Sequence, residues 1–175
     1  MFKYWKVLAT IAAVGTVSVA AVGGTYANFT ATPTTISSNA FSSGSLTMSR
    51  SGSGAIFSMS AAKIGDEATG SVTITNTGNL AGVYTLDGTT SGSAALNGQL
   101  NMKIYKDNDG VAGSKIYDGA LSSFSSTSLG TFAASGGAHT YYFHVSLPTT
   151  GTDAGDNAFQ GLSSSANFTW SATQA

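Results

Sequence analysis

The sequence contains no cysteine among its 175 residues, which excludes a disulfide framework and all thiol chemistry. Charged residues are also scarce. Asp, Glu, Lys and Arg make up 9% of the chain, against roughly 25% in an average globular protein. With a net charge of -1, the chain lacks the clustered basic surface that nucleic-acid binding requires. Low charge also means little repulsion between copies, so we expect the protein to self-associate.

The first 27 residues have the pattern of a secretory signal peptide. Lys3 and Lys6 precede an uncharged apolar run over residues 7–24, and small residues follow where a signal peptidase would cut. The residues around the expected cut between 27 and 28 are Thr25, Tyr26, Ala27 and Asn28. The alternative is a retained transmembrane anchor. That run, however, is close to the lower length limit for a span and is rich in Ala, Gly and Thr rather than Leu.

Alternation of apolar and polar side chains dominates the rest of the chain, whereas helical periodicity is nearly absent. Turn sequences such as "NTGN", "DNDG", "YDG" and "SGG" separate the alternating runs. About eight to ten short strands at regular spacing indicate an all-β fold, an antiparallel β-sandwich. The expected core residues are the inward members of these strands: Leu46, Met48, Val72, Ile74, Leu100, Met102, Ile104, Tyr141, Phe143, Val145, Leu147, Ala166, Phe168, Trp170 and Ala172.

Four segments, taken in order, resemble the TasA/camelysin family of secreted Gram-positive surface and matrix proteins. They are "GGTYANFT" at 23–30, "AFSSGSLTMS" at 40–49, "AKIGDEATGSVTITNTGNLAG" at 62–82 and "FQGLSSSANFTWSATQA" at 159–175. The first resembles the family's Gly-Gly-Thr-aromatic-Ala join between signal and mature protein, and the last resembles its closing strand. Residues 83–158 match only as a generic run of strands.

The resemblance implies a jelly-roll-like β-sandwich, preceded by a cleaved signal peptide, that polymerises into extracellular fibres of a biofilm matrix or cell surface. It implies a dedicated signal peptidase, and accessory anchoring or matrix proteins as further partners. The protein would touch the membrane only through its signal peptide before cleavage. The freed N-terminal segment would add to a neighbouring copy as a donor strand made of Asn28, Phe29, Thr30, Ala31, Thr32, Pro33, Thr34, Thr35 and Ile36. The expected organisation is a signal peptide over 1–27, a donor-strand segment over 28–39 and a sandwich domain over 40–175.

The residues of the donor segment suit strand addition. Phe29 and Ile36 are its only large apolar side chains, so it gains little by packing on its own domain. Pairing with another sheet edge would satisfy its backbone and let Phe29 fill a pocket. Pro33 has no N–H and must lie at an edge position or at the end of the pairing. The alternative is that this segment is the first strand of its own sandwich.

A cell-surface metallo-endopeptidase is the second hypothesis, because camelysin-type members of the family are classed as such. His139 and His144 lie five residues apart and would point to opposite faces of one strand. The sequence has no H-E-x-x-H motif, and its only glutamate, Glu67, is far away along the chain. A catalytic zinc normally needs three protein ligands. We therefore expect no metal, no cofactor and no catalytic residue, with His139 in a loop and His144 on a strand surface.

Two acidic turns and a set of aromatic residues have simpler explanations than a ligand site. Asp107 and Asp109 in "KDNDGVAG" do not follow the spacing of an EF-hand, so a hairpin turn is expected there, and "TGTDAGDN" is interpreted in the same way.

A monomeric surface- or carbohydrate-binding module is the third hypothesis. The alternation of Phe168 and Trp170 with polar neighbours nevertheless fits core packing better.

Overall fold

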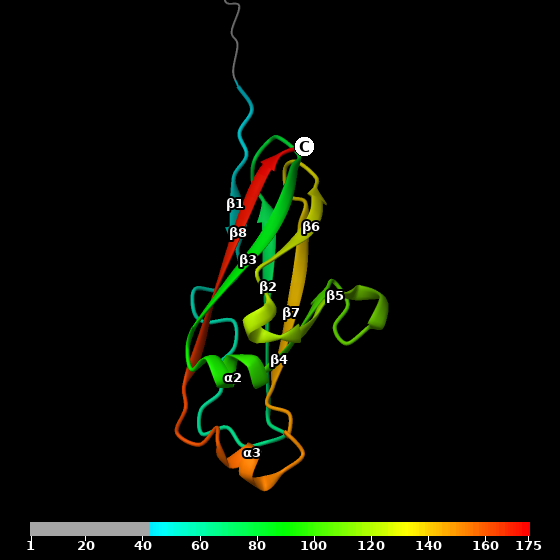
Figure 1. The fold of residues 1–175 in the computed structure, drawn as a ribbon. Coiled ribbons are helices and arrows are strands. Elements are labelled where there is room, and N and C mark those ends of the chain that lie inside the picture. Colours follow the sequence, from blue (N-terminus) through cyan, green and yellow to red (C-terminus); the bar gives the residue numbers. More distant parts are fainter. Residues whose placement is uncertain (1–42) are drawn as a thin grey trace, which may run out of the picture. The chain divides into compact units, whose positions relative to one another are not determined.

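The computed structural model describes residues 43–175, which form two antiparallel β-sheets with a shared apolar core (Figure 1). The larger sheet has the strand order β1-β2-β7-β4-β5, and the smaller sheet has the order β6-β3-β8. The prediction of an all-β, sandwich-like fold is confirmed. The predicted signal peptide, the cut between residues 27 and 28 and the donor segment 28–36 lie outside the described residues.

The eight strands of the described region are short to medium in length. They are β1 (Met48–Arg50), β2 (Glu67–Asn76), β3 (Gly82–Gly92), β4 (Asn101–Lys106), β5 (Lys115–Ala120), β6 (Ser126–Phe132), β7 (Ala138–Ser146) and β8 (Ser164–Gln174). Two 3-10 turns, η1 (Ala112–Ser114) and η2 (Leu121–Ser123), flank β5. The chain passes from one sheet to the other at five of the seven connections between these strands, so residues far apart in sequence meet across the core.

Two short helices, α2 (Ala94–Gln99) and α3 (Asp153–Asn157), also lie in the connections. Each begins at a hydroxyl cap, because Ser93 Oγ accepts a hydrogen bond from the Leu96 N–H and Thr152 Oγ1 accepts one from the Gly155 N–H. Such caps satisfy backbone donors that a helix end leaves free. The expectation of a simple turn at "TGTDAGDN" was therefore wrong, since the Thr152 cap starts α3 there.

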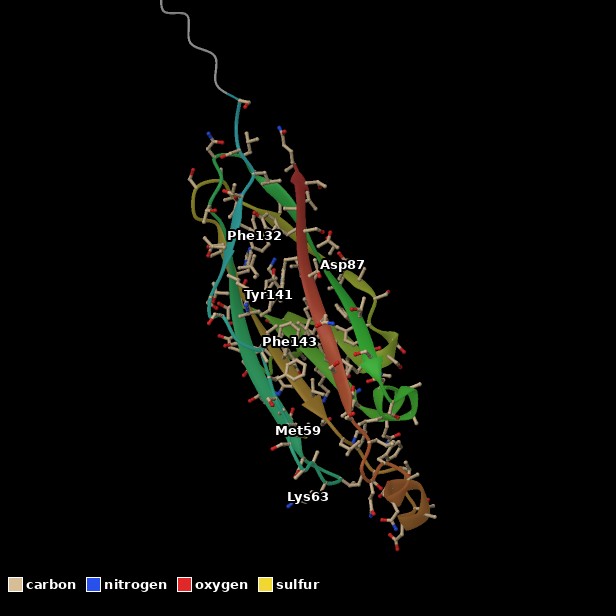
Figure 2. All side chains as sticks on the ribbon, turned by 90° about the vertical axis from the view of Figure 1, so that its left-hand side faces the viewer. Met59, Lys63, Asp87, Phe132, Tyr141 and Phe143 are labelled. Atoms are coloured by element: carbon tan, nitrogen blue, oxygen red, sulfur yellow. The ribbon has the colours of Figure 1, made fainter. Side chains whose placement is uncertain are left out.

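The core contains most of the predicted inward residues. Val72, Ile74, Met102, Ile104, Tyr141, Phe143, Val145 and Leu147 are all buried, and Figure 2 shows Phe132, Tyr141 and Phe143 between the sheets. The prediction missed Tyr84 and Leu86 of β3 and Leu129 and Phe132 of β6, which are equally buried. Met48 is exposed, so its assignment to the core was wrong: β1 is only a three-residue edge strand.

A buried asparagine closes the corner after β2. Asn76 has no exposed surface. Its Nδ2 donates to the carbonyls of Leu80 at 2.8 Å and Ala133 at 3.1 Å, and its Oδ1 accepts from the Gly78 N–H at 3.0 Å. A buried amide is tolerated only when its polar atoms find partners. The Asn-x-Gly corner thus links β2 to the turn after β6.

Candidate functional site

The strand β8 forms one edge of the smaller sheet. It pairs with β3 without a register shift along its whole length, from Gly82 opposite Gln174 to Gly92 opposite Ser164. Within the described part of the chain, no strand pairs with its other side. An edge strand presents unpaired N–H and C=O groups that can accept another strand. The inward residues of β8 (Ala166, Phe168, Trp170 and Ala172) pack against the core but are only partly buried.

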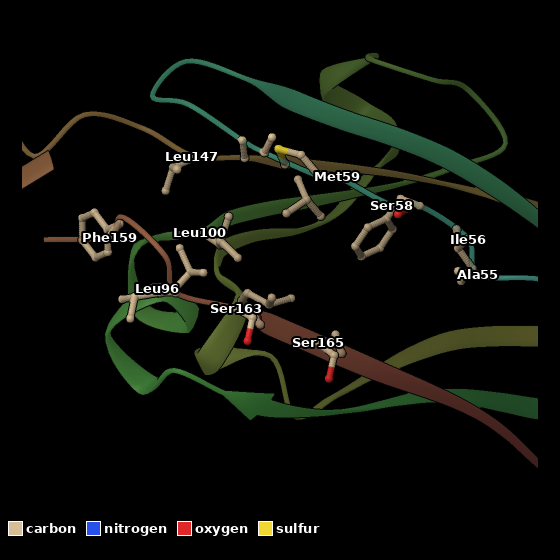
Figure 3. Close-up of a pocket in the computed structure, with 18 of the residues that line it drawn as sticks. Ala55, Ile56, Ser58, Met59, Leu96, Leu100, Leu147, Phe159, Ser163 and Ser165 are labelled. Atoms are coloured by element: carbon tan, nitrogen blue, oxygen red, sulfur yellow. The ribbon is translucent and has the colours of Figure 1, made fainter. Parts of the chain in front are cut away.

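A groove of about 1390 Å³ lies beside this edge (Figure 3). Residues 161–168 and Trp170, from β8 and the loop before it, form one part of its lining. Residues 54–59 and 61–64, which follow β1 in the chain, form another part. The rest of the lining includes the apolar side chains of Leu96, Leu100, Leu121, Val145 and Leu147. The groove therefore combines apolar side chains with polar ones and has the β8 strand along one wall.

The opposite wall of the groove, formed by residues 54–59 and 61–64, is held within the described residues by side chains and not by a backbone hydrogen-bond ladder. Between residues 43 and 175, no backbone–backbone hydrogen bond connects residues 52–62 to any other residue. Their backbone receives one side-chain hydrogen bond, from the Arg50 guanidinium to the Gly54 carbonyl at 3.4 Å. Apolar side chains hold the wall instead: the Phe57 ring lies 6.1 Å, centroid to centroid, from the rings of both Phe143 and Phe168.

Aromatic rings meet beneath β8. The Phe168 ring lies 5.0 Å from that of Phe143 and 6.0 Å from that of Phe124. Beside it, Trp170 Nε1 is buried without a hydrogen-bond partner in the described region. A buried indole N–H usually finds an acceptor. The inner side of β8 thus combines a phenylalanine cluster with an unused hydrogen-bond donor. The prediction that Phe168 and Trp170 lie against the core is confirmed.

The structure corrects the expectation for His139 and adds partners for His144. His139 lies in β7 rather than in a loop, and its Nδ1 is 2.6 Å from Asp107 Oδ2. His144 Nδ1 is 2.9 Å from Glu67 Oε1, and its Nε2 is 2.6 Å from Asp109 Oδ1. Glu67 is distant in sequence but close in space because β2 and β7 pair antiparallel. Strand spacing alone could not reveal that pairing.

These histidine contacts have clear electrostatic consequences. Partial burial lowers the pKa of His144, but the hydrogen bonds to Asp109 and Glu67 and their negative charges outweigh that effect and raise it overall. Burial raises the pKa of Asp107, but the hydrogen bonds from His139 and from the Thr140 N–H lower it overall. The two carboxylates around His144 bind opposite nitrogens of its ring, so they cannot share an ion with it.

The carboxylate oxygens of the two acidic turns form hydrogen bonds within the protein. The connection from β4 to β5 spans eight residues, 107–114, and is longer than the predicted hairpin turn because Asp107 and Asp109 turn back to the histidines of β7. In the other turn, the Asp156 carboxylate accepts from Thr149 Oγ1 and from both the N–H and Oγ1 of Thr150. Among residues 43–175, no group of three or more His, Cys, Asp or Glu side chains is placed to hold a metal ion.

No protein-family model matches the chain, and no curated protein matches it. Within residues 43–175, every helix is too short or too polar to cross a membrane. The fold and the groove define the class of this protein as an all-β, sandwich-like domain with an open edge strand. The features that could serve a function are that edge, the groove beside it and the loop that forms the groove's second wall.

Proposed function

We propose that this protein is an extracellular structural protein of the TasA/camelysin type that polymerises by donor-strand addition. The observation that supports the proposal best is the free edge of β8 beside a groove that contains apolar side chains. Such an edge binds an extended peptide through main-chain hydrogen bonds, and the neighbouring pockets select its side chains. The proposed occupant is the segment 28–36 of a second copy.

The sequence of the donor segment supports this assignment. Residues 28–34 of the donor segment read "NFTATPT" and residues 167–173, within β8, read "NFTWSAT", so four of the seven positions are identical. In β8, Ala166 and Phe168 point inward and Asn167 and Thr169 are exposed. The same alternation would turn Phe29 inward and Asn28 and Thr30 outward. The donor segment therefore has the same alternation of inward and outward side chains as β8, a strand of this sandwich.

Polymer growth follows from the geometry of such a contact. A segment of one copy that binds the edge of the next makes a head-to-tail interface, which propagates when it does not close into a ring. The same proposal includes secretion, cleavage between Ala27 and Asn28 by a dedicated signal peptidase, and a jelly-roll-like topology. Repeated passage of the chain between the two sheets supports that topology.

The test compares three versions of the mature chain by light scattering and electron microscopy. The chain that begins at Asn28 should form filaments, and a chain that begins at Ala40 should fold and stay monomeric. Replacing Phe29 by Ala should slow assembly strongly, whereas Thr30→Ala, a change on the outward side, should assemble like the parent. Identical filaments from the truncated chain would show that the segment is only the first strand of its own sheet.

A further inference from the structure

We propose that residues 54–59, which form one wall of the groove, are a displaceable plug that packs over the inner side of β8 in the free subunit and moves away when a donor strand binds. The inference rests on the proposed function, because the plug would control access to the same groove. It concerns a described loop that the sequence pattern did not single out. Three features of the loop support it: its backbone, its side chains and its contact with β2.

The backbone of the plug is free to leave. No backbone–backbone hydrogen bond from residues 52–62 to another part of residues 43–175 would be broken by its departure. Segments with few backbone hydrogen bonds and partly exposed side chains open locally at low cost. The neighbouring segments are tied down, because the Ser51 N–H donates to the Thr73 carbonyl and the Gly65 N–H donates to the Leu147 carbonyl. These two hydrogen bonds mark the ends of the part that can move.

The side chains of the plug fill the position that a donor strand needs. Phe57 sits among Phe143 and Phe168 at the base of the groove, and Ile56 also packs against the core. Both are only partly buried. An incoming Phe29 could replace the Phe57 ring with a ring of the same kind. The donor strand would in addition pair with the free backbone of β8, which the plug leaves unpaired. The exchange therefore gains main-chain hydrogen bonds without losing the aromatic contact.

Gly70 of β2 lets the plug sit close to the sheet. A Cβ added at this position would collide with the Ile56 carbonyl oxygen, so the plug backbone would have to move. Gly70 is not among the glycines with positive φ, so alanine fits the strand conformation itself. Gly54, inside the plug, has no heavy atom within 4 Å of an added Cβ. The same change to alanine therefore displaces the plug at Gly70 and leaves it unchanged at Gly54.

The experiment measures binding of a labelled peptide of residues 28–36 to the full chain by fluorescence anisotropy, below the concentration at which filaments form. Gly70→Ala should bind the peptide about tenfold more tightly than the parent, because removing a competing closed state raises the apparent affinity. Gly54→Ala should match the parent. Phe57→Ala, which removes the anchor of the plug, should also bind more tightly and serves if Gly70→Ala does not fold. Hydrogen exchange should show new protection along β8 in each complex.

The outcomes separate the plug from the fibre. Equal peptide affinity for the parent and for folded Gly70→Ala and Phe57→Ala, together with filaments from the parent, would overturn the plug and leave the proposed function standing. If the parent neither binds the peptide nor forms filaments, the proposed function is wrong and the plug inference is overturned with it. Tighter binding by both variants, with Gly54→Ala unchanged, would establish the plug.

Discussion

Replacing His144 by Gln should remove a pH-dependent part of the protein's stability. The imidazole lies between two carboxylates, and only the protonated ring can donate to both Glu67 and Asp109. The contacts raise the pKa of His144 above its unfolded value. A raised folded-state pKa stabilises the fold fully below the unfolded pKa of roughly 6.5, and the stabilisation is lost as the pH rises through the folded pKa. The effect of His144→Gln should therefore be largest near pH 5 to 6.

The structure sets the size of this effect. The side chain of His144 is 22% exposed, and those of Glu67 and Asp109 are 48% and 49% exposed, so solvent screens both pairs. Exposed pairs contribute roughly 0.2–1 kcal/mol each. Lys103 lies opposite His144 on β4, and its positive charge offsets part of this stabilisation. We expect a total of about 0.5–1.5 kcal/mol, or a fall of about 2–5 °C in Tm for a chain of this size.

Thermal unfolding of the parent and of His144→Gln at pH 5, 6, 7 and 8 provides the assay. The difference in Tm should shrink steadily towards pH 8. Glu67→Gln and Asp109→Asn should each reproduce part of the pH dependence, because each removes one of the two negative charges beside the His144 ring. A Tm difference that stays constant from pH 5 to pH 8, or that grows with pH, would refute the assignment of a raised pKa to His144.

Three further predictions concern other positions. Asn76→Ala should cost about 2–3 kcal/mol in urea unfolding, because the Leu80 and Ala133 carbonyls lose the donor that they share in the buried Asn76 amide; a cost under about 0.5 kcal/mol would show that water replaces the amide. Trp170→Ala should cost about 2–3 kcal/mol, less than the roughly 3–5 kcal/mol of a fully buried aromatic such as Phe143. Equal costs would mean that Trp170 is as buried as Phe143. The purified protein should lack chelator-sensitive casein cleavage and stoichiometric zinc, and cleavage abolished by His144→Ala would restore the metallo-endopeptidase hypothesis.

The strands that the sequence pattern predicted well share one property. The alternating parts of β2, β4 and β7 bury one face and expose the other, so their apolar and polar residues alternate cleanly. In β3, alternation is clear only at Tyr84 and Leu86, because Gly, Thr and Ser fill its second half. β6 contains just two large apolar residues, Leu129 and Phe132. Strands with so few large side chains leave little periodicity to detect.

The features of the candidate site were harder to predict because they depend on contacts between distant segments. Glu67 reaches His144 only through the pairing of β2 with β7, and Asp109 reaches it only because a loop turns back over the sheet. The plug has no periodic pattern, since Ile56 and Phe57 are adjacent and both face the core. Its position follows from Gly70, whose role appears only when β2 and the plug lie side by side. A single sequence contains no local signal for any of these contacts.

The lack of charge along β8 links the sequence to the proposed assembly. Natural proteins protect long edge strands with Lys, Pro, bulges or covering loops. β8 has none of the first three: no charged residue follows Asp156, no proline follows Pro148, and its pairing with β3 has no register shift. The plug covers the apolar inner side of β8 but does not pair with its backbone. Such an arrangement shields the groove from unspecific hydrophobic contact while leaving the edge open to a strand that brings both a backbone and a phenylalanine.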